Sequence, residues 1–225
     1  MPVVDLAVAR VRELNKALHQ LPRNTNETHW TVQNPAGQHS IAVGIDAPVE
    51  VLIEGHVGYY CAGMNKDAQV TIKGNAGVGL AENMMSGVVR LTGDASQAAG
   101  ATGRGGLLVI EGNASARCGI SMKGIDIVVK GSIGPMSAFM AQTGNLVVLG
   151  DAGEALGDSI YEAKLFVRGE VRSLGADCEE KPLGSEDRVI LSELLRRAEV
   201  DASVESFRLF GSARRLYHFH VDNAY

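Results

Sequence analysis

A glycine-rich segment, residues 100–106, is the part of the sequence closest to a known chemical motif. It reads GATGRGG, and glycine-rich loops bind phosphate through backbone N–H groups when a helix begins directly after the loop. No helical pattern follows here, and the segment falls at a turn between two units of an internal repeat. We therefore interpret it as a repeat turn. The sequence also lacks the GxSxG, HExxH, CxxC and Walker A motifs of common catalytic and cofactor sites.

Two histidines and three carboxylates are the remaining candidates for chemistry. His218 and His220 would place two imidazoles on one face of a strand, as some metal sites do, but no ligand partner stands at a recognisable spacing. We expect a structural or interface role for them. Asp94, Asp151 and Glu170 recur at one position of the repeat, mostly separated by amides or serine, which indicates a solvated ladder rather than an acid–base pair. The sequence thus predicts no catalytic, cofactor-binding or metal-binding residue in this chain.

The feature that organises the sequence is a glycine that recurs every 19 residues, without insertion or deletion. The repeat-defining glycines are Gly55, Gly74, Gly93, Gly112, Gly131, Gly150 and Gly169. Apolar residues stand four and two positions before each glycine, a polar residue follows it, and a small or β-branched residue comes two positions after it. Alternation of this kind predicts a strand. A glycine at a fixed phase predicts a bend that needs either positive φ or a close backbone approach.

Nineteen residues are too few for a strand and a helix at this glycine density, so each unit is predicted to form one coil of a solenoid. The expected fold class is an all-β solenoid, a right-handed parallel β-helix of seven 19-residue coils with capping helices at both termini. We place an N-terminal helix and cap at 1–40, the β-helix at 41–180, and a C-terminal helix with an aromatic tail at 181–225.

The two termini carry the expected caps. Residues 4–21 have apolar residues on one helical face and end at Pro22, whereas residues 28–43 resemble irregular strands. A second helix is predicted to start at Ser185 as its N-cap, with apolar residues from Val189 to Ala198.

Aromatic and methionine residues suggest contact surfaces. The candidate interface residues are Trp30, Phe207, Phe210, Tyr217, Phe219 and Tyr225. We expect Trp30 to be a cap or interface anchor rather than part of the coil core. The aromatic tail docks on the body or, as we favour, on a partner. Six methionines either fill the core or form an adaptable apolar surface: Met64, Met84, Met85, Met122, Met136 and Met140.

Composition and cysteine usage limit the protein classes that fit. The chain has 27 glycines in 225 residues, 45% hydrophobic residues and a net charge of −5, which argues against disorder, nucleic-acid binding and a polybasic membrane surface. No export signal or membrane span is visible, so we expect a cytoplasmic protein with reduced thiols. Cys61 and Cys118 share a repeat phase but lie three coils apart, roughly 14 Å, too far for a disulfide. We expect both to be buried small apolar residues.

The glycine spacing resembles that of a known domain. Gly55-xx-Gly58, Gly74-xx-Gly77, Gly131-xx-Gly134 and the segment 150–157 are similar to the Gly-xx-Gly-xxx-Gly repeats of the GXGXG domain. That domain forms the C-terminal β-helix of glutamate synthase large subunits and occurs as a free subunit of related complexes. The resemblance covers roughly residues 40–180. With its N-terminal helix, the chain looks most like the stand-alone β-helical subunit of N-methylglutamate synthase.

The resemblance implies a function outside this chain. It implies a structural, non-catalytic subunit that positions a glutamine-amidotransferase-like subunit and an FMN-binding, glutamate-synthase-like subunit in a hetero-oligomer. FMN, with an iron–sulfur cluster as a further candidate, is then expected on a partner. The complex would convert methylamine and glutamate to N-methylglutamate and ammonia. The corresponding β-helical subunit of a formylmethanofuran dehydrogenase and a self-assembling scaffold without an enzyme partner are the alternatives.

Overall fold

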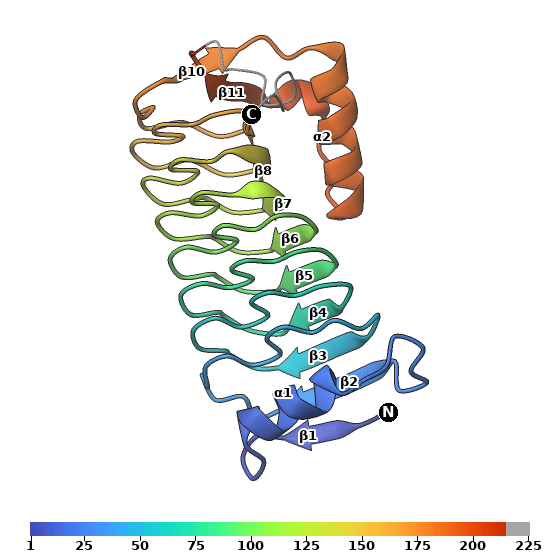
Figure 1. The fold of residues 1–225 in the computed structure, drawn as a ribbon. Coiled ribbons are helices and arrows are strands. Elements are labelled where there is room, and N and C mark those ends of the chain that lie inside the picture. The colour runs from blue at the N-terminus through green and yellow to red at the C-terminus, as the bar shows by residue number, and fades with distance from the viewer. Residues whose placement is uncertain (215–225) are drawn as a thin grey trace, which may run out of the picture.

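The protein forms an elongated solenoid of stacked parallel strands, as the computed structural model of residues 1–214 shows (Figure 1). The strands in chain order are β1 Val3–Asp5, β2 His29–Gln33, β3 Glu50–Glu54, β4 Gln69–Ile72, β5 Val88–Leu91, β6 Leu107–Ile110, β7 Lys123–Val129, β8 Thr143–Val148, β9 Lys164–Val167, β10 Cys178–Lys181 and β11 Arg208–Ser212. The helices are α1 Val11–His19, α2 Ser185–Arg197 and a 3-10 turn, Val204–Ser206.

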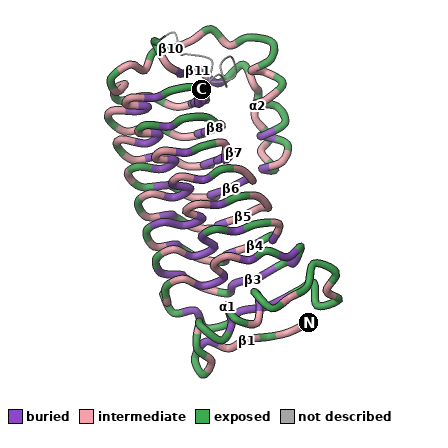
Figure 2. Tube along the Cα trace, viewed as in Figure 1, coloured by how far each residue is buried: buried purple, intermediate pink, exposed green. Residues whose placement is uncertain are grey.

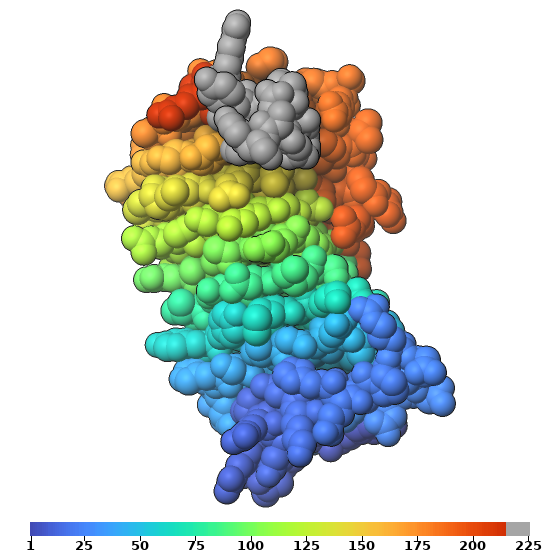
Figure 3. All heavy atoms as spheres, in the orientation of Figure 1, coloured from blue at the N-terminus to red at the C-terminus, as the bar shows by residue number. Residues whose placement is uncertain are grey.

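All the described strands belong to one sheet, in the order β1 to β9, then β11 and β10. From β3 to β9 each strand pairs in parallel with the next at the predicted 19-residue offset, as in Val51 with Val70 and Val70 with Val89. This ladder confirms the predicted parallel solenoid of seven repeating coils. In space-filling form the coils are successive bands along the long axis (Figure 3).

The core fills the narrow interior of the coils. The residues four and two positions before each repeat glycine are buried, for example Val51, Ile53, Val70 and Ile72. A second ladder of single bridges joins the positions two after the glycine, from Val57 to Val171. Buried segments therefore recur at the same place in every coil (Figure 2).

The repeat glycines are needed because neighbouring coils approach each other closely. A Cβ added to Gly112 would lie 2.4 Å from Asp94 Oδ1 and 2.8 Å from the Gly93 carbonyl oxygen. The other repeat glycines from Gly74 to Gly169 meet similar obstacles, and among the seven only Gly55 has positive φ. Of the two predicted reasons for the glycine, close backbone approach is therefore the one that applies to nearly every coil.

A second arc of each coil has left-handed backbone at every second residue, which the sequence did not indicate. In one coil these residues are Met136, Ala138 and Met140, with φ between 52° and 57°. The Ala138 N–H donates to the Cys118 carbonyl of the preceding coil, and the Met140 N–H donates to the Asp158 carbonyl of the following one, both at 2.8 Å. Hydrogen bonds to both neighbouring coils therefore hold a conformation that costs about 1–2 kcal/mol per residue.

The N-terminal end differs from the prediction in three ways. The helix expected over 4–21 is limited to α1, because residues 3–5 form β1 and pair with β2 at the open edge of the sheet. The segment 28–43, expected to be irregular, contains the regular strand β2. Trp30 is in register with Val51 and only 7% exposed. It belongs to the coil core, so the prediction that it lies outside the core is wrong.

At the C-terminal end, α2 lies along the outer face of the sheet (Figure 1). Leu191, Leu194 and Leu195 share a second hydrophobic cluster with outward-facing strand residues such as Val128 and Phe166. Val189, predicted on the apolar face, is 70% exposed.

The N-cap of α2 is Gly184 rather than the predicted Ser185. The Gly184 N–H donates to Asp187 Oδ2 at 3.0 Å, so the first turn is stabilised by Asp187. Among residues 1–214, no helix is both long and apolar enough to cross a membrane.

Candidate functional site

The polar residues that follow the repeat glycines form a hydrogen-bonded ladder along the solenoid. Asn75 Oδ1 accepts the Asp94 N–H at 2.9 Å, and Asp94 Oδ1 accepts the Asn113 N–H at 2.7 Å. The pattern continues through Asp151, whose carboxylate accepts the Glu170 N–H at 2.9 Å. Because these carboxylates accept backbone N–H groups of the next coil, they act as structural acceptors. This agrees with the predicted ladder and gives no acid–base pair.

The cysteines are not activated nucleophiles. Cys61 and Cys118 are free and buried, as predicted. Burial raises the pKa of both thiols to about 12. Burial also raises the pKa of the half-buried Cys178 thiol to about 11. A thiol must be deprotonated to attack or to bind a metal, so all three are inert near neutral pH.

A partly buried carboxylate, Asp126, lies between the sheet and the C-terminal end of α2. Asp126 Oδ1 accepts a hydrogen bond from Asn145 Nδ2 at 2.8 Å, and Arg197 lies 3.5 Å from Oδ2. Burial raises the pKa of the Asp126 carboxyl above its ordinary value, against the lowering effect of both partners. Arg90 donates to the Arg197 carbonyl oxygen at 2.6 Å and so caps the helix. These residues fasten α2 to the solenoid.

The sequence marks the contacts of Asp126, Asn145, Arg90 and Arg197 only indirectly. The available signal was that β6 to β9 each have three consecutive apolar residues, whereas β4 and β5 carry Thr71 and Arg90 at the outward position; β3, with Leu52 there, is the exception. An unbroken apolar strand is buried on both faces, which would have placed a covering element over β6 to β9.

A hollow of about 740 Å³ lies near the C-terminal end of the solenoid. Its lining includes Tyr161, Lys164, Asp187, Phe210 and Arg214. Lys164 Nζ is 2.7 Å from Asp187 Oδ1, and Arg214 pairs with Asp177. Lys164 and Arg214 are therefore engaged with carboxylates, whereas Glu162, which also lines the hollow, forms no ion pair with any of residues 1–214.

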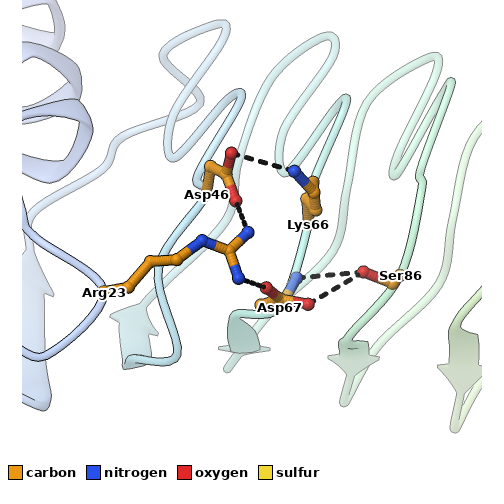
Figure 4. A network of polar contacts seen from close by, with 5 residues as sticks. All are labelled: Arg23, Asp46, Lys66, Asp67 and Ser86. Carbon is orange, nitrogen blue, oxygen red and sulfur yellow. Dashed lines mark hydrogen bonds and ion pairs between the residues drawn. The ribbon is translucent and has the colours of Figure 1, made fainter.

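An exposed network ties the N-terminal segment to the first coils (Figure 4). Arg23 bridges Asp46 at 2.6 Å and Asp67 at 3.0 Å, and Lys66 pairs with Asp46 at 3.0 Å. The Lys66 hydrogen bond, together with Arg23, lowers the pKa of the Asp46 carboxyl. Ser86 donates to Asp67 at 3.2 Å. We interpret this network as structural, because its charged groups are paired with each other and hold the N-terminal segment against the first coils.

The remaining predicted residues divide between the core and the undescribed tail. Phe207 and Phe210 are buried against the body.

Segment 100–106 is a coil turn followed by strand β6, as expected for a repeat turn. Within residues 1–214, no group of His, Cys, Asp and Glu side chains is arranged to hold a metal ion. Tyr217, His218, Phe219, His220 and Tyr225 lie outside the described residues.

Comparison with known proteins identifies a full-length relative. The chain is 64% identical over 225 residues to Protein GlxC of Rhizobium meliloti (strain 1021). The aligned region covers 100% of this chain and 99% of that protein. No protein-family model matches the chain, and no solved structure matches it. Identity of this extent over the whole length means that the chain belongs to the GlxC family.

Proposed function

We propose that this chain is a structural, non-catalytic subunit of a glutamate synthase-like complex, most specifically of N-methylglutamate synthase. The observation that carries the proposal is the uninterrupted column of repeat glycines, which resembles the GXGXG domain and packs the coils into a continuous rod. The chemistry, methylamine and glutamate to N-methylglutamate and ammonia, then belongs to an FMN-binding partner. A glutamine-amidotransferase-like subunit is the second partner.

The described side chains favour a positioning role. The carboxylates of the ladder accept backbone hydrogen bonds, the thiols are protonated, and Lys164 and Asp187 of the C-terminal hollow are paired with each other. Coils that are locked by main-chain hydrogen bonds on each side form a stiff spacer, which suits a subunit that fixes the separation of two others.

Co-expression of the three subunits, with and without this chain, tests the proposal. With the chain present, we expect the amidotransferase-like and flavin subunits to co-elute on size exclusion and to form N-methylglutamate from methylamine and glutamate. Without it, the two should separate. The isolated chain should show no turnover.

Three outcomes would contradict the proposal. Turnover by the isolated chain would place catalytic residues on it. Co-purification from the source organism with molybdopterin and iron–sulfur subunits would favour the formylmethanofuran dehydrogenase alternative. Recovery of copies of this chain alone would favour a self-assembling scaffold.

A further inference from the structure

One lateral edge of the solenoid has an unusual surface. It consists of the positions nine and eleven residues after the repeat glycine in the coils from Gly55 to Gly150, which we call the lateral ridge. Position eleven is occupied, in coil order, by Lys66, Met85, Arg104, Lys123, Gln142 and Tyr161. Position nine adds Met64 and Met140 among otherwise small polar residues. Not one position of the ridge carries a carboxylate, although the chain as a whole has 26 acidic residues against 21 basic ones.

The backbone forces these side chains outward. The residue between the two positions, such as Met84, Met122 or Ile160, is buried in the core, so its neighbours on both sides face solvent. Met85 is 44% exposed, Met140 43% and Tyr161 43%. Hydrogen bonds to adjacent coils fix the left-handed backbone at position nine and so hold Met64 and Met140 outward.

The ridge also carries two stacked positive charges without a carboxylate partner among residues 1–214. In another column, two opposite charges of adjacent coils pair with each other: Lys130 Nζ lies 2.7 Å from Glu111 Oε2. Arg104 and Lys123 occupy one column in adjacent coils, about 4.8 Å apart along the stack. Neither forms an ion pair with any of residues 1–214. Two like charges this close repel each other, and an opposite charge from a bound partner would relieve that repulsion.

We propose that the lateral ridge is the surface on which this chain binds a partner protein subunit, and that the partner presents carboxylates to Arg104 and Lys123 and an apolar face to Met85, Met140 and Tyr161. Methionine adapts to irregular apolar surfaces, and tyrosine and arginine are enriched where interfaces carry most of their binding energy. This inference rests on the proposed function, since it assigns the docking face of that complex. The net charge of −5 disfavours a nucleic acid as the occupant.

The test uses the complex purified from the source organism with a tag on this chain. Hydroxyl-radical footprinting compares the oxidation rates of Met85, Met140 and Tyr161 in the complex and in the isolated chain. We expect at least about fivefold protection in the complex. A zero-length carbodiimide cross-linker, which joins amines to carboxylates, should link Lys123 to an Asp or Glu of the partner. The Lys123→Arg variant keeps the charge but lacks the reactive amine, so this cross-link should disappear while the complex persists.

A charge-reversed pair supplies a matched control. Arg104→Glu with Lys123→Glu should weaken retention of the partner by at least about tenfold. Lys73→Glu with Arg117→Glu changes the net charge equally at other columns and should leave it unchanged. Urea unfolding of both double variants checks that they fold alike.

The outcomes separate this inference from the proposed function. If the predicted subunits co-purify but the ridge methionines oxidise at the same rate in both states, the docking face is elsewhere and the proposed function stands. Protection that nuclease treatment removes would point to a nucleic acid and overturn the inference. If this chain is recovered without any other protein, both the proposed function and the inference fail.

Discussion

Replacing Gly112 by alanine tests the packing argument for the repeat glycines. The added Cβ would lie 2.4 Å from Asp94 Oδ1, 2.8 Å from the Gly93 carbonyl oxygen and 2.9 Å from the Gly93 carbonyl carbon. The two Gly93 atoms are backbone and cannot rotate away, so the coils must separate. Overpacking of this kind costs about 1–3 kcal/mol. The Gly112 N–H bond to Gly93 and the Asn113 N–H bond to Asp94 each contribute about 1 kcal/mol and would both be weakened. We therefore expect Gly112→Ala to lower the free energy of unfolding by about 3 kcal/mol.

Gly211→Ala is the matched control, because its nearest neighbours would lie 3.8 Å from the added Cβ and its φ is not positive. We expect it to change stability by less than about 0.5 kcal/mol. Urea unfolding followed by Trp30 fluorescence and far-UV circular dichroism measures both variants, and for Gly112→Ala the midpoint should fall by about 1 M.

A double-mutant cycle identifies the cause. Because the Asp94 carboxylate is one of the obstacles, Asp94→Ala should relieve part of the strain in Gly112→Ala, with a coupling of about 1 kcal/mol. Equal midpoints for Gly112→Ala and Gly211→Ala would refute the close-approach explanation and leave the glycine column without a steric reason.

Three further predictions concern α2 and the buried groups. Leu194→Ala should cost about 3 kcal/mol because Leu194 is buried between α2 and the sheet, whereas Val189→Ala, at an exposed position of the same helix, should be near neutral in thermal unfolding. Since the pKa of Asp126 is raised in the folded chain, its charged form opposes folding; Asp126→Asn should therefore be more stable than the wild type at pH 7, and the difference should vanish as the pH falls below the unfolded value of 3.8. Cys61 and Cys118 should resist a thiol reagent at pH 7 until urea unfolds the chain, and rapid labelling in buffer would contradict their burial.

The sequence predicts the repeating part of this structure well for a physical reason. Each coil buries its apolar residues only by stacking on its neighbours in register, so the glycine period determines the ladder from β3 to β9. The polar ladder follows from the same period, since equivalent residues of adjacent coils are neighbours in space.

The parts that break the period were harder to predict. Residues 3–5 form β1 because the end of the sheet offers a strand to pair with, which local helical periodicity does not reveal. The left-handed arc accommodates Tyr60, Arg117 and Met136 at one repeat position, so no residue type marks it. Hydrogen bonds between coils impose that conformation, and it is therefore a property of the stack rather than of the local sequence.

The register of the coils also restricts how this molecule can change in length. From β3 to β9 nearly all ladder contacts join residues 19 apart, so a whole added coil preserves these contacts, whereas an insertion of another size is expected to leave the stack as a loop. The length of the solenoid can therefore change only in steps of one coil, about 4.8 Å each. In the proposed complex, the separation of two subunits bound along the solenoid would change only by whole coils, so the number of coils would set that separation.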